Sequence, residues 1–169
     1  MKNVILIGFM GSGKSTVGKL LTQELGFKFL DTDKLIEKKE RRKISDIFAQ
    51  AGEKYFRKLE TDCIKKLAWR QNLVLATGGG IILKKINARL LRKMGPVVYL
   101  KVSPKKVLER LGEDQARPLL NVSQRLKKIR QILKTRKENY LQAADLVVNT
   151  DNLLPSQIVK KIVKYLEKL

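Results

Sequence analysis

The sequence predicts an α/β protein, a three-layer sandwich in which helices cover both faces of a five-stranded parallel sheet. Five short apolar runs alternate along the chain with segments of helical length and pattern, which is the order of β-α-β units. The runs are apolar throughout and do not alternate with polar residues, as is typical of strands buried on both faces. The first run also enters a glycine-rich turn that opens an amphipathic segment.

Each element can be placed by its residues. The strands are expected at Val4–Ile7, Phe27–Leu30, Leu73–Ala76, Val97–Val102 and Leu146–Val148. The helices are expected at Lys14–Leu25, as a pair across Lys34–Gln50, and at Lys54–Arg70, Lys84–Lys93, Pro104–Leu111, Ser123–Ala143 and Pro155–Lys168. Local chemistry supports several boundaries, because Gly26 is a typical helix stop and Ser103-Pro104 supplies an N-cap followed by proline at the first helical position. Cys63 falls on the apolar face of its helix, so we expect a core residue and not a reactive thiol.

Composition excludes several kinds of chemistry. The chain has 169 residues, no His and one Cys, a length that suits one domain, here residues 1–169. Without His there is no imidazole catalysis or His-ligated metal, and a single Cys excludes an internal disulfide or a multi-cysteine zinc site. No apolar run approaches the ~20 residues of a membrane helix. We therefore expect a cytoplasmic protein, most simply a monomer.

The charge is strongly positive, at +21 from 37 Lys and Arg against 16 Asp and Glu. Such a surface suits nucleic acid, an anionic membrane or anionic small molecules, whereas the simpler interpretation is a lysine-rich solvated surface. Basic residues cluster at Lys34–Lys43 and Arg125–Lys137, spread over several helix faces and without interleaved aromatic residues for base stacking. We therefore expect neither a nucleic-acid nor a membrane partner.

The turn after the first strand has the pattern of a phosphate-binding loop. Gly8-x-x-x-x-Gly13-Lys14-Ser15 satisfies G-x-x-x-x-G-K-[ST] between an apolar strand and an amphipathic helix. Backbone N–H groups of such a loop and the helix N-terminus bind a nucleoside triphosphate. Lys14 should reach the β- and γ-phosphates and face solvent until ATP arrives, Ser15 should ligate Mg²⁺, and Thr16 can add a hydroxyl to the α-phosphate. The ATP-binding residues of the loop are therefore expected to be Gly11, Ser12, Gly13, Lys14, Ser15 and Thr16.

Acids follow the second strand and glycines follow the third. Because carboxyl ends of neighbouring parallel strands meet at one crevice, Asp31, Asp33 and Gly78-Gly79-Gly80 should lie beside the phosphate-binding loop. Asp31 could hold Mg²⁺ and Asp33 could accept the proton of an attacking hydroxyl. The alternatives are that either acid only caps the following helix, and that the glycines form an ordinary loop. Three glycines would let a substrate lie against bare backbone.

Three arginines stand at informative positions. Arg57 and Glu60 are three apart on one helix face, where Glu60 could hold the guanidinium. Arg117 lies in the long polar stretch Gly112–Ser123, and Arg136 lies near the end of a long helix. Arginine binds carboxylates in a bidentate way. In so basic a chain any single arginine could be surface decoration, so only their pattern argues for a site.

Together these residues resemble the shikimate kinases, which belong to the nucleoside-monophosphate-kinase-like group. The resemblance covers nearly the whole chain and rests on Gly8–Thr16, Asp31-Thr32-Asp33, Gly52-Glu53-x-x-Phe56-Arg57-x-x-Glu60, Gly78-Gly79-Gly80, Arg117-Pro118-Leu119-Leu120, and Arg136 with Tyr140. It implies a P-loop kinase fold with strand order 2-3-1-4-5, a short lid at about 112–123 and substrate-binding helices at about 33–61. It also implies Mg²⁺-dependent transfer of the ATP γ-phosphoryl group to the 3-hydroxyl of shikimate.

The resemblance assigns roles by position. Asp33, Arg57, Gly79 and Arg136, with the flanking Gly78 and Gly80, are similar to the shikimate contacts. Arg117 resembles the lid arginine that closes on the ATP phosphates, and Arg110 resembles part of the adenine site. Family members often carry an arginine near adenine after the last strand. Here Thr150–Leu153 has none, so backbone or Asn152 would take that contact.

Two other functions fit parts of the pattern. A gluconate kinase would share the architecture, but it would be expected to lack the Phe56-Arg57-x-x-Glu60 run. A nucleic-acid-binding protein with a regulatory nucleotide site would explain the charge, and it predicts salt-sensitive binding to DNA or RNA.

Overall fold

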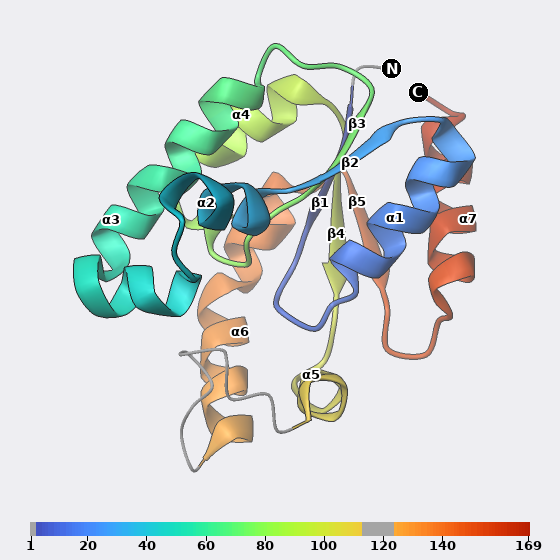
Figure 1. Ribbon diagram of the computed structural model, residues 1–169. Coiled ribbons are helices and arrows are strands. Elements are labelled where there is room, and N and C mark those ends of the chain that lie inside the picture. The colour runs from blue at the N-terminus through green and yellow to red at the C-terminus, as the bar shows by residue number, and fades with distance from the viewer. Residues whose placement is uncertain (1–2, 113–123) are drawn as a thin grey trace.

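The computed structural model describes residues 3–112 and 124–169. Its centre is a parallel sheet in the order β2-β3-β1-β4-β5, which confirms the predicted fold class and strand order (Figure 1). The strands are β1 (Asn3–Ile7), β2 (Lys28–Asp31), β3 (Leu73–Ala76), β4 (Val97–Lys101) and β5 (Leu146–Asn149). Each lies within two residues of its predicted position.

Helices cover both faces of the sheet, as Figure 1 shows. On one face lie α1 (Lys14–Leu25) and α7 (Pro155–Leu166). On the other lie α3 (Ile44–Leu67), α4 (Lys85–Met94) and α6 (Arg125–Ala143). The shorter elements are α2 (Thr32–Glu40), α5 (Pro104–Leu111) and the 3₁₀ helix η1 (Ile81–Leu83).

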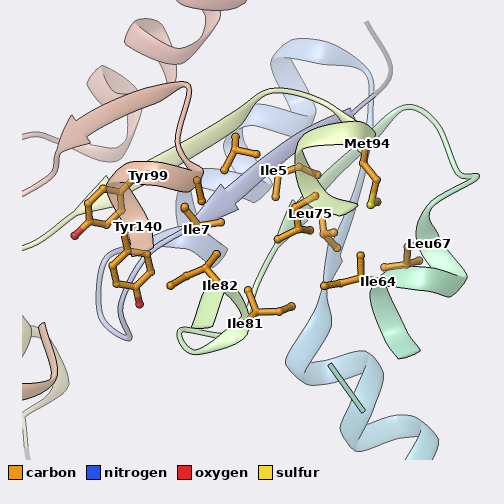
Figure 2. Close-up of a cluster of buried hydrophobic side chains, with 13 residues drawn as sticks. Ile5, Ile7, Ile64, Leu67, Leu75, Ile81, Ile82, Met94, Tyr99 and Tyr140 are labelled. Carbon is orange, nitrogen blue, oxygen red and sulfur yellow. The ribbon is translucent and has the colours of Figure 1, made fainter. Parts of the chain in front are cut away.

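Alternation along β1 separates two cores. Ile5 and Ile7 point toward α3, α4 and α6, in the cluster drawn in Figure 2. Val4 and Leu6 point the other way, toward α1 and α7. Every residue of β1 is buried, as expected for a central strand of a sheet covered on both sides.

The helix pair before α4 follows the prediction with two refinements. Gly52 has φ +77°, a conformation that favours glycine, and it breaks α3 into two helical segments where the sequence predicted separate helices. The helix α2 begins at Thr32 and not at Lys34, because the Asp31 side chain caps it. The 3₁₀ turn η1 was not predicted.

Cys63 is partly buried and packs against the cores on both sides of α3, in agreement with a structural role. Burial raises the pKa of its thiol to about 11, so the thiol is protonated at neutral pH.

Among the helices of the described residues, none combines the length and the apolar character needed to span a membrane.

Candidate active site

The phosphate-binding loop (residues 8–15) joins β1 to α1 at the carboxyl edge of the sheet. Gly13 is the N-cap of α1 with φ +91°, where a side chain would be strained. The Ser12 hydroxyl is buried and has no hydrogen-bond partner among the described residues. A buried polar group without a partner is costly in a folded protein.

Lys14 does not face solvent, so that expectation is wrong. Its Nζ donates hydrogen bonds of 2.8 Å to the carbonyl oxygens of Gly8 and Phe9, and the residue is partly buried. These two carbonyl groups hold the ammonium group against the loop, at the site where the sequence predicts that phosphates bind.

Asp31 contacts both α1 and α2. Its Oδ1 accepts from the backbone N–H groups of Asp33 at 3.0 Å and Lys34 at 3.4 Å, so the helix-cap interpretation is correct as far as it goes. Its Oδ2 accepts from the Ser15 hydroxyl at 3.2 Å. A carboxylate and a hydroxyl oxygen side by side suit a hard divalent cation such as Mg²⁺, which keeps most of its coordination sphere for water and phosphate. Within the described residues no three Asp, Glu, Cys or His side chains gather, so an all-protein metal cage is not formed there.

The second half of α3 presents Arg57 to the interior, held by two carboxylates. Its Nη1 donates to Glu60 Oε2 at 2.7 Å, which confirms the predicted pair. Its Nε and Nη2 donate to Glu53 Oε1 at 3.2 and 3.0 Å. Burial acts to lower the pKa of Arg57, but the two carboxylates outweigh it and raise that pKa overall. The guanidinium is therefore charged and fixed in direction.

The glycine turn (Gly78–Gly80) lets charged side chains approach the backbone closely. A Cβ on Gly80 would overlap the guanidinium of Arg57. A Cβ on Gly78 would lie 2.5 Å from Asp33 Oδ1 and 3.0 Å from Glu60 Oε1. The three glycines are therefore not an ordinary loop, because two of these positions have no room for a side chain.

The helix α6 contacts the same turn. Arg136 is buried and its Nη1 donates to the carbonyl oxygen of Gly79 at 3.3 Å. The Tyr140 hydroxyl donates to the same oxygen, and its ring stacks on Tyr99 of β4 with centroids 4.7 Å apart (Figure 2). Burial raises the pKa of Tyr140, so its hydroxyl stays protonated and remains a donor.

These contacts bring the predicted residues together. Asp33, Arg57 and Arg136 surround the glycine turn, and we call this group with Gly78–Gly80 the glycine-turn site. The site adjoins the phosphate-binding loop, because a Cβ on Gly79 would be 3.5 Å from the carbonyl oxygen of Gly8, one of the two that hold Lys14.

Arg110, on α5, contacts the phosphate-binding loop. Its guanidinium donates to the Gly11 carbonyl at 3.0 Å and to the side chain and carbonyl of Thr150 at 3.1 and 2.6 Å. It thereby ties the loop to the turn after β5, where Asn152 is exposed. Arg117 and the expected lid beyond Gly112 fall within residues 113–123, which lie outside the described residues.

Sequence reasoning left three contributions unassigned. Thr32 accepts from the Gly78 N–H through its hydroxyl at 2.9 Å, Glu53 supplies the second carboxylate to Arg57, and Tyr140 binds the Gly79 carbonyl. Of these three residues, only Glu53 could have been assigned from the sequence, because it lies four residues before Arg57 on a helix and side chains at that spacing are neighbours. The other two contacts join segments far apart in the chain.

The fold and these two adjoining groups define a P-loop phosphotransferase, with a second site suited to a small acceptor that carries a negative charge. A family model described as shikimate kinase matches residues 10–167. The chain belongs to the shikimate kinase family, and its activity is that of a shikimate kinase.

Shikimate kinases of other organisms match this chain over nearly all of their length. The shikimate kinase of Sulfurihydrogenibium sp. (strain YO3AOP1) is 49% identical over 168 residues, 99% of each chain. The shikimate kinase from Acinetobacter baumannii, solved in complex with shikimate, is 39% identical and superposes with a TM-score of 0.96 over 99% of this chain and 94% of that one. A gluconokinase from Sinorhizobium meliloti 1021, at 15% identity and TM-score 0.57 over 99% of this chain and 92% of that one, shares only the fold.

Proposed function

We propose that the chain transfers the γ-phosphoryl group of ATP to the 3-hydroxyl of shikimate, bound in the glycine-turn site. The observation that carries this proposal is the placement of Asp33, Arg57 and Arg136 around one bare backbone turn that adjoins the phosphate-binding loop. A polyhydroxy acid needs guanidinium groups for its carboxylate, a carboxylate for its hydroxyls and an open backbone surface for its ring. Each of these is present there.

Arg57 and Arg136 bind the carboxylate of shikimate in this proposal. Arg57 is held by Glu53 and Glu60, and Arg136 by the Gly79 carbonyl. Both guanidinium groups are mostly buried, so their attraction for an anion is less screened than it would be in water. Asp33 then faces the hydroxyls, orients the 3-hydroxyl and accepts its proton as the phosphoryl group is transferred.

The phosphate-binding loop aligns ATP with that hydroxyl. Backbone N–H groups of residues 11–16 bind the phosphates, and Lys14 moves from its two carbonyl partners to the β- and γ-phosphates. Ser15 and Asp31 would hold Mg²⁺, whose chemistry is to neutralise charge on the phosphate oxygens. Arg110 lines the adenine side, and Arg117 closes from the lid at about 112–123, within one kinase domain whose substrate-binding helices span about 33–61.

A coupled assay of ADP release tests the proposal. Shikimate with ATP and Mg²⁺ should give turnover, whereas gluconate and nucleoside monophosphates should give only the background rate, and chelation of Mg²⁺ should abolish the signal. Phosphate transfer to gluconate at a comparable rate, or turnover that ignores Mg²⁺, would contradict it. The phosphorylated position on shikimate is read by ³¹P–¹H NMR of the product.

A further inference from the structure

Glu60 has a position that its role as a partner of Arg57 does not explain. Its side chain is fully buried, and only Oε2 is engaged, by Arg57 at 2.7 Å. Oε1 is also buried and has no hydrogen-bond partner among the described residues. A purely structural ion pair would satisfy both oxygens, because an ionised oxygen without donors is expensive to bury.

A second carboxylate lies against the same surface. Glu60 Oε1 and Asp33 Oδ1 both approach the Cα of Gly78, at 3.0 and 2.5 Å from the position of a Cβ there. The two oxygens are therefore separated by no more than the sum of these distances. Both oxygen atoms are buried, although Asp33 as a whole is only partly buried, and two carboxylate oxygens this close raise the cost of ionising both groups.

The charges that act on Glu60 come from three helices. Its own helix α3 contributes Arg57, with Glu53 behind it, α2 contributes Asp33, and α6 contributes Arg136. Burial is the largest influence and raises the pKa of Glu60 to about 7, against the lowering effect of Arg57. Asp33 adds to the rise and Arg136 opposes it.

Among residues 3–112 and 124–169, the other titratable groups on the neighbouring elements are neutral or face solvent. The thiol of Cys63 and the hydroxyl of Tyr140 have raised pKa values and are uncharged at neutral pH. The 3₁₀ turn η1 is apolar (Ile81–Leu83). The basic side chains of α4 are exposed, namely Lys85, Arg89, Arg92 and Lys93.

We propose that Glu60 takes up a proton on Oε1 when shikimate binds, so that the charge around Arg57 stays balanced as the substrate carboxylate arrives. The inference rests on the proposed binding of shikimate at Arg57 and Arg136. Before binding, Arg57 is neutralised by Glu60 and Glu53. Shikimate adds another negative charge to Arg57 and excludes water, and both effects favour the protonated form of Glu60. The proton comes from solvent, Oε2 keeps its bond to Arg57, and Glu60 remains a positioning residue without contact to the reacting atoms.

Calorimetry of shikimate binding tests this directly. Binding heats are measured at pH 7.5 in phosphate, HEPES and Tris, whose ionisation enthalpies differ, and the slope of heat against ionisation enthalpy gives the protons taken up. We expect uptake of about half a proton for the wild type. Glu60→Gln should bring it near zero. Glu53→Gln is the matched control, because it also removes a carboxylate from Arg57 but from an exposed side chain, and it should keep the uptake.

The outcomes separate this inference from the proposed function. Binding heats of the wild type that are independent of buffer, or uptake that persists in Glu60→Gln, would overturn the role of Glu60 while shikimate binding stands. If the wild type binds no shikimate at all, the proposed function itself fails. A second measurement needs no variant, because proton uptake requires shikimate affinity of the wild type to fall several-fold between pH 6.5 and pH 8.5. An affinity that is flat over this range contradicts the proposal.

Discussion

Lys14 carries the largest expected effect of any single residue on turnover. Lys14→Ala should lower kcat by about 10²–10⁴-fold, because the ammonium group that neutralises charge on the transferred phosphoryl group is lost. Lys19→Ala, an exposed lysine on the same helix, is the matched control and should leave kcat unchanged. Steady-state kinetics with thermal melting of both variants makes the comparison. A Lys14→Ala enzyme that folds and turns over normally would refute the assigned role.

Substitution of Arg136 should weaken the binding of shikimate much more than that of ATP. Arg136→Ala is expected to raise the KM for shikimate by about tenfold or more, since a charged hydrogen bond to a carboxylate is worth roughly 1.5–3 kcal/mol. The KM for ATP should change much less. Lys137→Ala removes a neighbouring exposed charge on α6 and controls for the general loss of positive charge. A larger effect on ATP than on shikimate would mean that Arg136 belongs to the nucleotide site.

Glu60 also makes stability depend on pH in a predictable direction. Its pKa is about 7 in the folded chain against an ordinary value of 4.5, so the folded state holds more protons between these values. The contribution of Glu60 to the free energy of unfolding should therefore be largest below pH 4.5. It should fall as the pH rises through about 7, by at most about 3 kcal/mol in total. Urea unfolding of the wild type and Glu60→Gln between pH 5 and pH 8 should show a flatter dependence in the variant. Parallel curves would contradict the raised pKa.

At the scale of elements, α6 contacts the glycine turn through Tyr140 as well as Arg136. Tyr140→Phe keeps the ring that stacks on Tyr99 but removes the hydrogen bond to the Gly79 carbonyl. We expect a loss of stability of about 1 kcal/mol and a several-fold higher KM for shikimate with kcat less affected. Tyr99→Phe removes the hydroxyl of the stacking partner on β4 and is the control. Equal kinetic effects of the two changes would show that Tyr140 acts only through core packing.

Elements were predictable from the sequence to the extent that they depend on local pattern. The apolar runs located β1, β3 and β4, because strands buried on both faces are apolar throughout and are not mistaken for surface strands, in which polar and apolar residues alternate. The start of α2 was misplaced by two residues because its cap, Asp31, also ends a strand and bonds Ser15 of another helix.

The candidate site also has a part that local sequence pattern predicts and a part that it does not. The phosphate-binding loop and the Arg57–Glu60 pair follow from spacing along one segment. The contacts of Thr32 and Tyr140 with the glycine turn span 46 and 61 residues, and only the packing of the whole sheet with α2 and α6 creates them. The solvent exposure expected of Lys14 failed for a related reason, because the curvature of the loop turns two carbonyls toward the side chain.

For the whole molecule, the excess of positive charge should act on stability and on substrate binding in opposite ways. The net charge of +21 is self-repulsive in a compact fold and attractive to the anions ATP and shikimate. Raising NaCl from 0.1 M to 1 M shortens the Debye length from about 10 Å to about 3 Å. The melting temperature should therefore rise by a few degrees, while the KM of both substrates increases. Sucrose at matched osmolarity separates screening from water activity, since it should leave both KM values unchanged. A melting temperature that falls with salt would mean that favourable ion pairs outweigh the repulsion, and unchanged KM values would show that the surface charge does not assist binding.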